Sequence, residues 1–263
     1  FSEKVVGFDS TGITINNCKI TDFNGNSNPT FYVSIEALGE GLMTLRVPGG
    51  EAQAESSGND NSESDLFEIT YDISEPDPPA TPDLASVDDT GVTDTDNITY
   101  HTSGLQFTGT AEPESTVELL SDRDGPLGTD TADGSGNWTV YADVSADETT
   151  PHSITAVATD RAGNTSPASA AVLVTVDNTS PAAITGINMS VATGEVTLSW
   201  DDPADTAGVA LAWDPPDNNG EATVAAGVQT YTATGLTNGT TYAFDLVAYD
   251  SAGNTSAPVS TEA

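Results

Sequence analysis

The feature that most constrains the fold of this chain is a loop motif that recurs along it. An acidic residue is followed four positions later by an Asn that stands behind a Gly, at Glu55–Asn59 (ESSGN), Asp160–Asn164 (DRAGN) and Asp250–Asn254 (DSAGN). Twice, a little downstream, an Asp is followed four positions later by Pro, at Asp72–Pro76 and Asp177–Pro181. The motifs lie roughly 90 to 105 residues apart, which is the size of one β-sandwich. The chain is therefore predicted to be a string of similar modules, with its function at the joints.

The composition and charge fit an extracellular string of domains better than a cytosolic enzyme. The chain has 263 residues, of which 36% are hydrophobic, and this is enough apolar material for two or three cores. Its 41 acidic residues against 5 basic ones give a net charge of -36. This charge repels anionic membrane surfaces and nucleic acid, and nucleic-acid binding is excluded. Because so many carboxylates must be screened by salt or neutralised by cations, we expect a saline or calcium-rich medium.

The cysteine content bears on how the modules are held together, and the start of the sequence bears on whether the chain is a piece of a longer protein. Cys18 is the single cysteine, so no internal disulfide can staple the modules, and we interpret it as a small buried strand residue. Metal ions are the obvious substitute as a rigidifying device. The sequence has no apolar run long enough to span a membrane and no signal sequence, and it begins with Phe1 rather than Met. We therefore expect a mature piece or a fragment of a longer protein.

The hydrophobic periodicity is two residues rather than 3.6, and this predicts strands. Alternating stretches rich in Val, Ile, Thr, Tyr and Phe are each bounded by Gly, Asn, Asp or Pro. Such stretches occur at residues 13–15, 31–35, 116–120, 138–142, 153–158, 172–176, 195–200 and 242–249. No segment has a convincing amphipathic helical pattern. The chain is predicted to be all-β.

The middle of the chain, from about Pro78 to Asp177, can be laid out strand by strand. Seven strands are predicted, an immunoglobulin-like number, at residues 84–87, 105–110, 116–121, 128–132, 138–144, 153–159 and 168–176. If they alternate up and down, the loops 112–114, 133–137 and 160–164 lie at the end where the chain enters. The loops 88–96, 122–124 and 147–148, together with Asp177, lie at the end where it leaves.

This layout places oxygen ligands at each joint between modules. The Asp of Asp-x-x-x-Pro ends one module, and the Asp-x-x-Gly-Asn loop of the next module faces it. Calcium takes six to eight oxygen ligands in flexible geometry, and such a loop supplies them. Proline just past the joint stiffens the linker. Calcium is therefore the predicted cofactor, and the result is a semi-rigid rod. The alternative is that acidic-x-x-Gly-Asn is a plain hairpin turn on a surface already crowded with carboxylates.

The candidate ligands form two sets. For the first joint they are Asp72, Glu75, Asp77, Asp160 and Asn164, with help from Glu112 or Asp133. For the second joint they are Asp177, Asp250 and Asn254, with Asp88, Asp89, Asp94 or Asp96 from the same end of the middle module and Asp201 or Asp202 from the next module.

The residues of the middle module carry a family resemblance. Its linker PDPPATPDL, the turn GTAEPES, the strand GSGNWTV and the hairpin ATDRAGNTSPAS leading to TVDNTSP resemble the bacterial Ig-like repeats of giant surface adhesins and biofilm proteins. The resemblance implies extender modules stacked in arrays that hold an adhesive tip away from the cell. It also implies calcium at the linkers, and the matching positions here are Asp160, Asn164 and Asp177.

The last module resembles a fibronectin type III domain. Trp200 in VTLSW and the stretch TYTATGLTNGTTYAFDLVAYD match that pattern, with Leu236 and Tyr242 at the positions of the core Leu and the corner Tyr. Trp200 should fill the space between the sheets, and the Tyr242 hydroxyl should bond to nearby backbone. Trp213 is more typical of a core residue than of a sugar-stacking platform.

The first module resembles another bacterial Ig-like type, through FSEKVVGF, GITI and a later VPGG turn. The first strand of that pattern and most of the second would precede Phe1. A sandwich without them leaves an unpaired edge and an exposed apolar face. Either the chain is cut from a longer array, or a strand comes from a neighbouring subunit as in donor-strand filaments. The predicted modules are thus residues 1–75, 76–178 and 179–263.

The sequence offers little for catalysis, so we expect no enzyme. His101 and His152 are the only histidines and have no zinc-binding spacing, and no nucleophile elbow, Walker loop or dinucleotide fingerprint occurs. Three hypotheses remain for a secreted or cell-surface protein. It is the stalk of a bacterial adhesin, a subunit of an extracellular filament, or an accessory region of a secreted polysaccharide-degrading enzyme. The last predicts sugar binding by Trp213 or another exposed aromatic.

The expected partners are neighbouring modules of a longer chain or other copies in a filament. No direct membrane insertion is expected, and a glycan or surface receptor would bind elsewhere in the parent protein.

Overall fold

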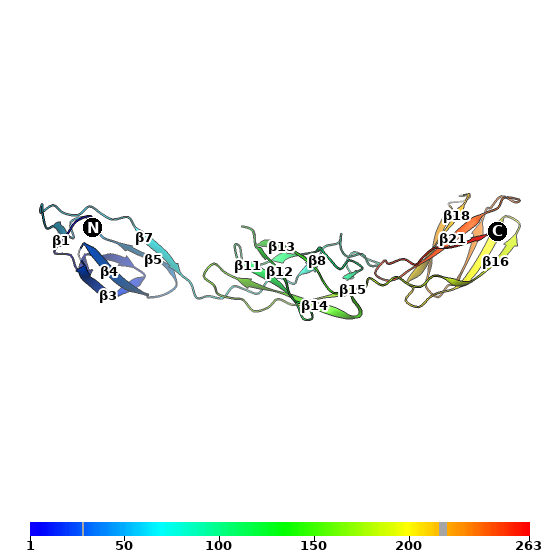
Figure 1. Cartoon of the computed structure of the whole chain (residues 1–263), viewed down its shortest axis with the longest axis horizontal. Helices are drawn as coiled ribbons and strands as arrows, with labels where there is room; N and C mark the ends of the chain where they lie inside the picture. The colour runs from blue at the N-terminus through cyan, green and yellow to red at the C-terminus, as the bar shows by residue number, and fades with distance from the viewer. Residues whose placement is uncertain (28, 216–219) are drawn as a thin grey trace. The chain divides into compact units, whose positions relative to one another are not determined.

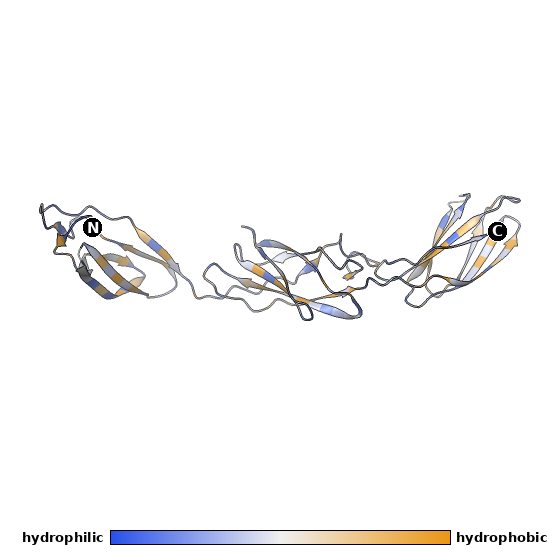
Figure 2. Ribbon diagram, in the orientation of Figure 1, coloured by the Kyte–Doolittle hydropathy of each residue, from blue (hydrophilic) through white to orange (hydrophobic). Residues whose placement is uncertain are grey.

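The computed structural model describes residues 1–27, 29–215 and 220–263 of the chain. These residues form two compact units, the first of Phe1–Glu75 with Ala162–Asn164, and the second of Pro76–Arg161 with Thr165–Ala263. The regular elements are strands, apart from one 3-10 turn at Ser10–Gly12 (Figure 1). Hydrophobic and hydrophilic residues alternate along many of these strands (Figure 2). The all-β prediction is confirmed.

The first unit is built from two small sheets and a short strand pair. β2, β5 and β7 form a three-stranded sheet, β3 and β4 form a hairpin, and β1 pairs with β6. The strands are β1 Val5–Val6, β2 Thr14–Asn16, β3 Cys18–Ser27, β4 Thr30–Ala37, β5 Gly41–Arg46, β6 Gln53–Ala54 and β7 Phe67–Tyr71. Four aromatic rings, those of Phe1, Phe8, Phe23 and Phe31, contact one another with centroids 5.0 to 5.7 Å apart. Cys18 is buried, as predicted.

The edge strand β7 is exposed along its whole length. Phe67 and Ile69 are paired with Leu45 and Met43 of β5 and therefore share a face with them. Met43 is buried, yet Phe67, Ile69 and Tyr71 are 54%, 46% and 40% exposed. The inner face of β7 therefore has no covering layer among the described residues of this unit.

The middle module of the second unit contains two sheets around one core. Their strand orders are β13-β10-β8 and β12-β11-β14-β15-β9. The strands are β8 Asp83–Leu84, β9 Ile98–Thr99, β10 Leu105–Thr110, β11 Thr116–Ser121, β12 Gly125–Thr131, β13 Asn137–Ala142, β14 Asp147–Thr159 and β15 Val172–Val176. Phe107, Trp138 and Ile154 are among the buried side chains between the sheets. Trp138 lies over Gly109 of the neighbouring strand, where a Cβ atom would collide with its indole ring.

All seven predicted strands overlap strands of the structure, and two of them have the predicted bounds. β10 and β11 have the predicted bounds, but β9 was not predicted because it has two residues and joins β15 through parallel pairing. The predicted strand 168–176 begins only at Val172. Upstream of it, the hydroxyl groups of Ser166 and Ser169 accept the backbone N–H groups of Ala158 and Ala156. Side-chain oxygens thus replace part of the backbone ladder.

The hairpin between β12 and β13 contains a further Asp-x-x-Gly-Asn sequence, Asp133–Asn137, which the repeat analysis missed. Asp133 Oδ1 accepts the backbone N–H groups of Ser135 at 2.8 Å and Asn137 at 2.9 Å. The Asn137 amide nitrogen lies 3.2 Å from Asp133 Oδ2. The backbone N–H and side chain of Asn137 lower the pKa of Asp133 below its usual range. Here the motif is a self-contained turn.

The last module has a separate core between two further sheets. Their strand orders are β16-β17-β20 and β19-β18-β21-β22. The strands are β16 Thr185–Ala192, β17 Glu195–Asp201, β18 Gly208–Asp214, β19 Glu221–Ala225, β20 Thr230–Thr234, β21 Ala243–Tyr249 and β22 Val259–Glu262. Trp200, Trp213 and Leu236 are buried in this core. The Tyr242 hydroxyl accepts the backbone N–H of Thr237 at 2.8 Å. The predicted roles of Trp200, Leu236 and Tyr242 are confirmed.

Removing the Tyr242 hydroxyl should weaken the last module. The substitution Tyr242→Phe leaves the Thr237 N–H without this partner, and we expect it to lower the free energy of unfolding by about 1 kcal/mol. Urea unfolding followed by tryptophan fluorescence measures the change, because Trp200 and Trp213 lie in this core. Tyr141→Phe is the control, since Tyr141 is 67% exposed. Equal losses in both variants would contradict the assigned role.

Asp133 should give the middle module a pH-dependent contribution. Its folded pKa lies below the ordinary value of 3.8, so its charged form stabilises the fold above that value. This contribution is lost as the pH falls through the folded pKa. Asp133→Asn should therefore lower the melting temperature at pH 7, and the difference from wild type should shrink below about pH 4.

Calorimetry at pH 7 and at pH 3 measures this difference. Asp94→Asn is the matched control, because the exposed Asp94 side chain makes no hydrogen bond with the described residues. If the difference in melting temperature between Asp133→Asn and wild type is as large at pH 3 as at pH 7, the charge of Asp133 does not contribute to stability.

Candidate functional site

The loop Asp250–Asn254 repeats the geometry of the Asp133 turn. Asp250 Oδ1 accepts the backbone N–H groups of Ala252 and Asn254, both at 2.9 Å. Asp250 Oδ2 accepts one hydrogen of the Asn254 side-chain amide at 2.9 Å. Gly253 has a φ of 92°, a left-handed conformation that favours glycine. The local sequence alone therefore fixes this turn.

What distinguishes the Asn254 loop is its contact with the middle module, which belongs to the same compact unit. The Asn254 amide nitrogen donates a second hydrogen bond, 2.7 Å long, to the backbone carbonyl of Asp177. The Thr90 hydroxyl donates to the Ala252 carbonyl at 2.7 Å. A Cβ atom at Gly253 would lie 2.9 Å from the Thr90 carbonyl oxygen. The missing side chain thus permits the close approach.

Three carboxylates from three segments converge at this junction. One ligand oxygen from each of Glu148, Asp177 and Asp205 lies within 4.8 Å of the other two. Asp177 is 5% exposed, whereas Glu148 and Asp205 are open to solvent. This convergence agrees with the prediction that the loop 147–148 and Asp177 share one end of the middle module.

Strand pairing and turn hydrogen bonds bring these carboxylates together. Asp147 pairs with Val176 across the antiparallel strands β14 and β15, so Glu148 and Asp177 are diagonal neighbours across this pair. The segment on both sides of Glu148 is held by Arg123, which donates to Asp147 Oδ2 at 2.5 Å and to the Thr150 carbonyl at 2.7 Å. Hydrogen bonds from Thr149 and Arg123 hold the pKa of Asp147 well below its usual range.

Asp205 reaches the junction from the loop between β17 and β18. The Thr206 hydroxyl closes this loop by donating to the Pro203 carbonyl at 2.8 Å, and the Ala207 N–H donates to the Tyr249 carbonyl at 2.8 Å. Asp205 has a φ of 65°, which Asp tolerates better than most residues. Partial burial of its carboxyl group raises the pKa of Asp205, and the charges of Asp177 and Asp250 raise it further. The neighbouring carboxylates therefore disfavour the charged form of Asp205, and the oxygen donors of the cluster suit a hard cation such as Ca²⁺.

The structure places the other candidates for the second joint in different roles. Asp88 accepts the Gln106 N–H at 2.8 Å and lies 3.3 Å from His101 Nδ1. Asp89 accepts the N–H groups of Asn97 and Ile98 at 3.0 and 3.2 Å. Burial raises the pKa of Asp89 against the lowering effect of the Asn97 bond. Both carboxylates therefore accept hydrogen bonds that hold the segment 88–106 together.

The remaining candidates for this joint also lie outside the cluster. Asp96 accepts the Thr93 and Ile98 N–H groups at 3.0 and 3.2 Å, and Asp94 is exposed. Asp202 accepts the Trp200 indole N–H at 2.8 Å and the Gly227 N–H at 2.7 Å. Asp201 is exposed and lies against Gly186.

The candidates for the first joint are divided between the two units. Asp72, Glu75 and Asn164 belong to the first unit, and Asp77 and Asp160 to the second. Within the first unit, the Asn164 amide nitrogen lies 3.4 Å from the Asp72 carbonyl oxygen. Asp72 Oδ1 accepts the Ser74 N–H at 3.0 Å. Metal binding by this set stays a prediction.

Sequence reasoning missed Glu148 and Asp205 as cluster members. A signal existed for Glu148, because its loop was placed at the correct end of the middle module. Asp205 could have been found by extending the up-and-down alternation to the last module. That alternation puts the loop after β17 beside the loop Asp250–Asn254, at the end where the chain enters.

The histidines and the cysteine have structural environments. His152 is fully buried, with Nε2 2.8 Å from the Ser145 carbonyl and Nδ1 3.0 Å from the Ser121 hydroxyl. His101 stands against Asp88 and the Tyr100 ring. The Cys18 sulfur is buried, 4.0 Å from the Thr44 carbonyl.

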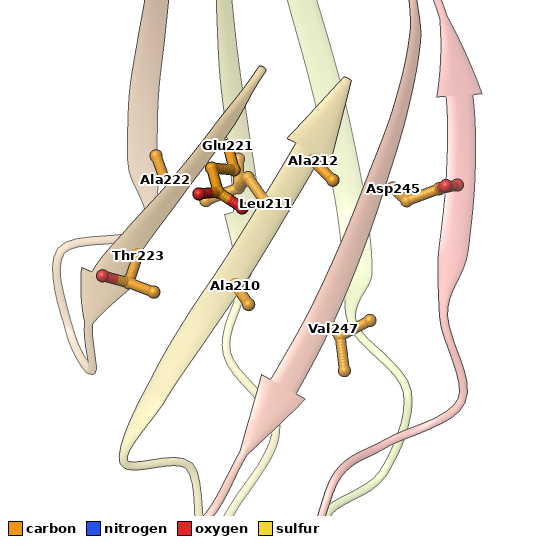
Figure 3. A pocket seen from close by; sticks show the side chains of 8 residues that line it. All are labelled: Ala210, Leu211, Ala212, Glu221, Ala222, Thr223, Asp245 and Val247. Atoms are coloured by element: carbon orange, nitrogen blue, oxygen red, sulfur yellow. The ribbon is translucent and has the colours of Figure 1, made fainter. Parts of the chain in front are cut away.

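A hollow of about 510 Å³ lies on the outer face of the four-stranded sheet of the last module. Figure 3 shows Ala210 and Ala212 of β18 at its floor, with Glu221 and Asp245 on the flanking strands. The two carboxylates stand on opposite sides of β18, roughly 9.5 Å apart at the backbone.

No helix within the described ranges is long and apolar enough to cross a membrane.

Two curated relatives are exoglucanases of Cellulomonas fimi. Exoglucanase B is 34% identical over 131 residues, which is 48% of this chain and 12% of the relative. Exoglucanase A is 42% identical over 108 residues, which is 38% of this chain and 12% of the relative. The chain thus covers about an eighth of the length of each.

Solved structures with a similar arrangement of strands include two sets of fibronectin modules. The FN1-FN3 domains of chicken CNTN1 align with a TM-score of 0.44 at 15% identity, covering 95% of this chain and 89% of that one. The fibronectin(III)-like modules of Clostridium thermocellum CbhA align with a TM-score of 0.41 at 16% identity, covering 63% of this chain and 87% of that one.

Family models match the chain in two places. Residues 75–178 match the bacterial Ig-like domain Big_13, and residues 182–262 match the fibronectin type III domain. The chain therefore carries a bacterial Ig-like domain followed by a fibronectin type III domain.

Proposed function

We propose that this chain is a non-catalytic spacer segment of an extracellular protein, in which calcium stiffens the junction between the Ig-like and fibronectin domains. The observation that carries the proposal is the convergence of Glu148, Asp177 and Asp205, contributed by both domains. A divalent cation between them would join the domains through ligands from each, and would relieve the repulsion that raises the pKa of Asp205. A spacer whose bend is fixed in this way would hold the parts of the protein on either side of it at a set distance and angle, without catalysing a reaction.

The direct hydrogen bonds at the junction support the same function. The bonds from Asn254 to the Asp177 carbonyl and from Thr90 to the Ala252 carbonyl orient the two domains. A cation would then bind to ligands that are already near their final positions, which reduces the ordering cost of binding. Calcium would therefore add stiffness to an existing contact.

Calcium should stabilise the chain, and Asp205 should control the effect. At a free calcium concentration a hundredfold above Kd, binding to the native state adds about 2.7 kcal/mol. Asp205→Asn should lose most of this gain, because it removes a charged ligand. In chelator the same variant should melt above wild type, because it also removes like-charge repulsion.

Thermal unfolding measured with calcium and with chelator tests both of these expected changes in melting temperature. Asp201→Asn is the matched control, since Asp201 belongs to the same loop region but lies outside the cluster. Its calcium response should equal that of wild type. Unchanged melting and an unchanged radius of gyration on chelation would contradict the calcium clamp.

The parent of such a spacer could belong to either of two classes. The similarity of residues 75–178 to bacterial Ig-like domains supports the stalk of a surface adhesin. The exoglucanase relatives support an accessory region of a polysaccharide-degrading enzyme. Trp213 is only 5% exposed, which confirms its interpretation as a core residue, so this side chain offers no surface for sugar stacking. Sequencing the complete parent gene separates the classes, since the second requires a catalytic domain elsewhere.

A second candidate function is a filament subunit assembled by strand donation, and strand β7 favours it. The side chains of Phe67, Ile69 and Tyr71 lie on one exposed face of a sheet edge. An added strand from another copy would bond to the edge or cover this face.

If strand donation occurs, the full chain should self-associate with increasing concentration. Ile69→Lys should weaken this association at least about tenfold, because covering an isoleucine contributes about 1.5 to 3 kcal/mol. Light scattering over a concentration series measures it. Val191→Lys is the control, since Val191 is 69% exposed on a strand of the last module. A chain that stays monomeric at every concentration would remove the filament candidate.

A further inference from the structure

The loop Glu55–Asn59 of the first unit is built like the loop that contacts the middle module. In the last module, Ala248 and Ser256 close the loop, with the Ser256 N–H donating to the Ala248 carbonyl at 2.9 Å and the Ala248 N–H to the Ser256 hydroxyl at 3.0 Å. In the first unit, the Asn61 N–H donates to the Ala52 carbonyl at 2.9 Å, and the Ala52 N–H to Asn61 Oδ1 at 2.8 Å. The closing bonds correspond, with one extra residue in the first loop.

The backbone turn at the tip also corresponds. Gly58 and Gly253 both have left-handed φ values, 72° and 92°. An isolated bridge closes each loop, between Gln53 and Asp60 in one and between Tyr249 and Thr255 in the other. Asn59 therefore holds the position that Asn254 holds in the last module.

The two asparagines differ in what they bind. The Asn254 amide donates to the carbonyl of Asp177, the residue that follows the last strand of the preceding module. The Asn164 amide lies against the carbonyl of Asp72, which follows β7. The Asn59 side chain is exposed and has no hydrogen-bond partner among the described residues. A Cβ added at Gly58 would meet no described atom within 4 Å apart from those of its chain neighbours.

Asn59 also lines a hollow into which a chain end could fit. The hollow has a volume of about 520 Å³ and is lined by Phe1, Ser2, Glu3 and the segment from Asn59 to Ser64, among others. The loop is tied to the start of the chain by bonds from Glu55 N to the Lys4 carbonyl at 2.9 Å and from Ser56 to Glu3 at 2.5 Å. The segment Phe1–Lys4 therefore lies beside this loop.

We propose that the loop Glu55–Asn59 is a docking surface for another β-sandwich module placed ahead of the first unit. Its partner is the end of that module's last strand, where Asn59 donates to the backbone carbonyl of an acidic residue, as Asn254 does to Asp177. The inference rests on the proposed spacer function, because it requires consecutive modules. It does not require calcium, because the bond joins an amide to a carbonyl.

The test joins a copy of residues 76–178, which has a complete core of its own, ahead of Phe1 in the full chain. A flexible Gly/Ser linker of about ten residues lets the added module find its own geometry at high effective concentration. The backbone amide resonance of Gly58 reports the docked fraction, and ¹⁵N relaxation reports whether the added module tumbles with the first unit. The measurement is made in chelator, so failure of the calcium clamp cannot affect it.

We expect the added module to shift the Gly58 resonance and to tumble with the first unit. Asn59→Ala should reduce the ratio of docked to undocked molecules about fivefold, the value of one ordinary hydrogen bond. Asn16→Ala, at an exposed position on β2, should leave the ratio unchanged. Asn254→Ala should loosen the last two modules to a similar degree.

Three results would overturn the proposal. They are no Gly58 shift on adding the module, an equal docked ratio in Asn59→Ala and wild type, and loosening by Asn254→Ala without any effect of Asn59→Ala. Circular dichroism of Asn59→Ala verifies that the exposed substitution leaves the fold intact.

Discussion

The structure depends on the hydrogen bond from a backbone N–H group to an aspartate side chain. With 41 acidic residues and 5 basic ones, ion pairs cannot neutralise the surface. Asp133 and Asp250 each accept two backbone N–H groups within their own turns, and Asp89 does the same for the loop that contains it. At Asp133 these donors lower the pKa and so favour the charged carboxylate. In all three loops the carboxylate holds the local turn through backbone N–H groups rather than through an ion pair.

The same interaction explains why the repeated motif forms a self-contained turn in one loop and also contacts another module in a second loop. The Asp133 loop shows that Asp-x-x-Gly-Asn makes a turn without help from any neighbour. The Asn254 loop makes the same turn with one amide hydrogen and donates the other to the Asp177 carbonyl. Position along the chain, rather than the motif itself, therefore decides which turn forms a joint. The plain-hairpin alternative is correct for the local structure, and the joint is added to it.

The sequence predicted what local periodicity controls, and less of what contacts through space control. Long alternating strands such as β10 and β11, and the buried Trp200 and Tyr242, follow from patterns within a few residues. The two-residue strand β9 exists only because β15 lies beside it, so no local pattern could indicate it.

The candidate site divides in the same way. Asp177 was predicted from its motif, whereas Glu148 and Asp205 join it through strand pairing and a loop from another domain. A sequence with 41 acidic residues offers many carboxylates for any joint. Selecting the right ones requires the register of β14 against β15, which composition and spacing do not give.

The first unit and the middle module differ in how well their edge strands are protected from pairing with another chain. The edge strand β12 contains Pro126, and its pairing with β11 has a bulge opposite Leu119 and Leu120. Both features discourage pairing with another chain. Strand β7 pairs with β5 without a bulge and contains no proline. Its apolar face is exposed, although the facing residue Met43 is buried. An edge of this kind favours strand addition. Among the described residues, the sheet that contains β7 leaves this apolar face uncovered, whereas the other modules enclose their cores between two sheets.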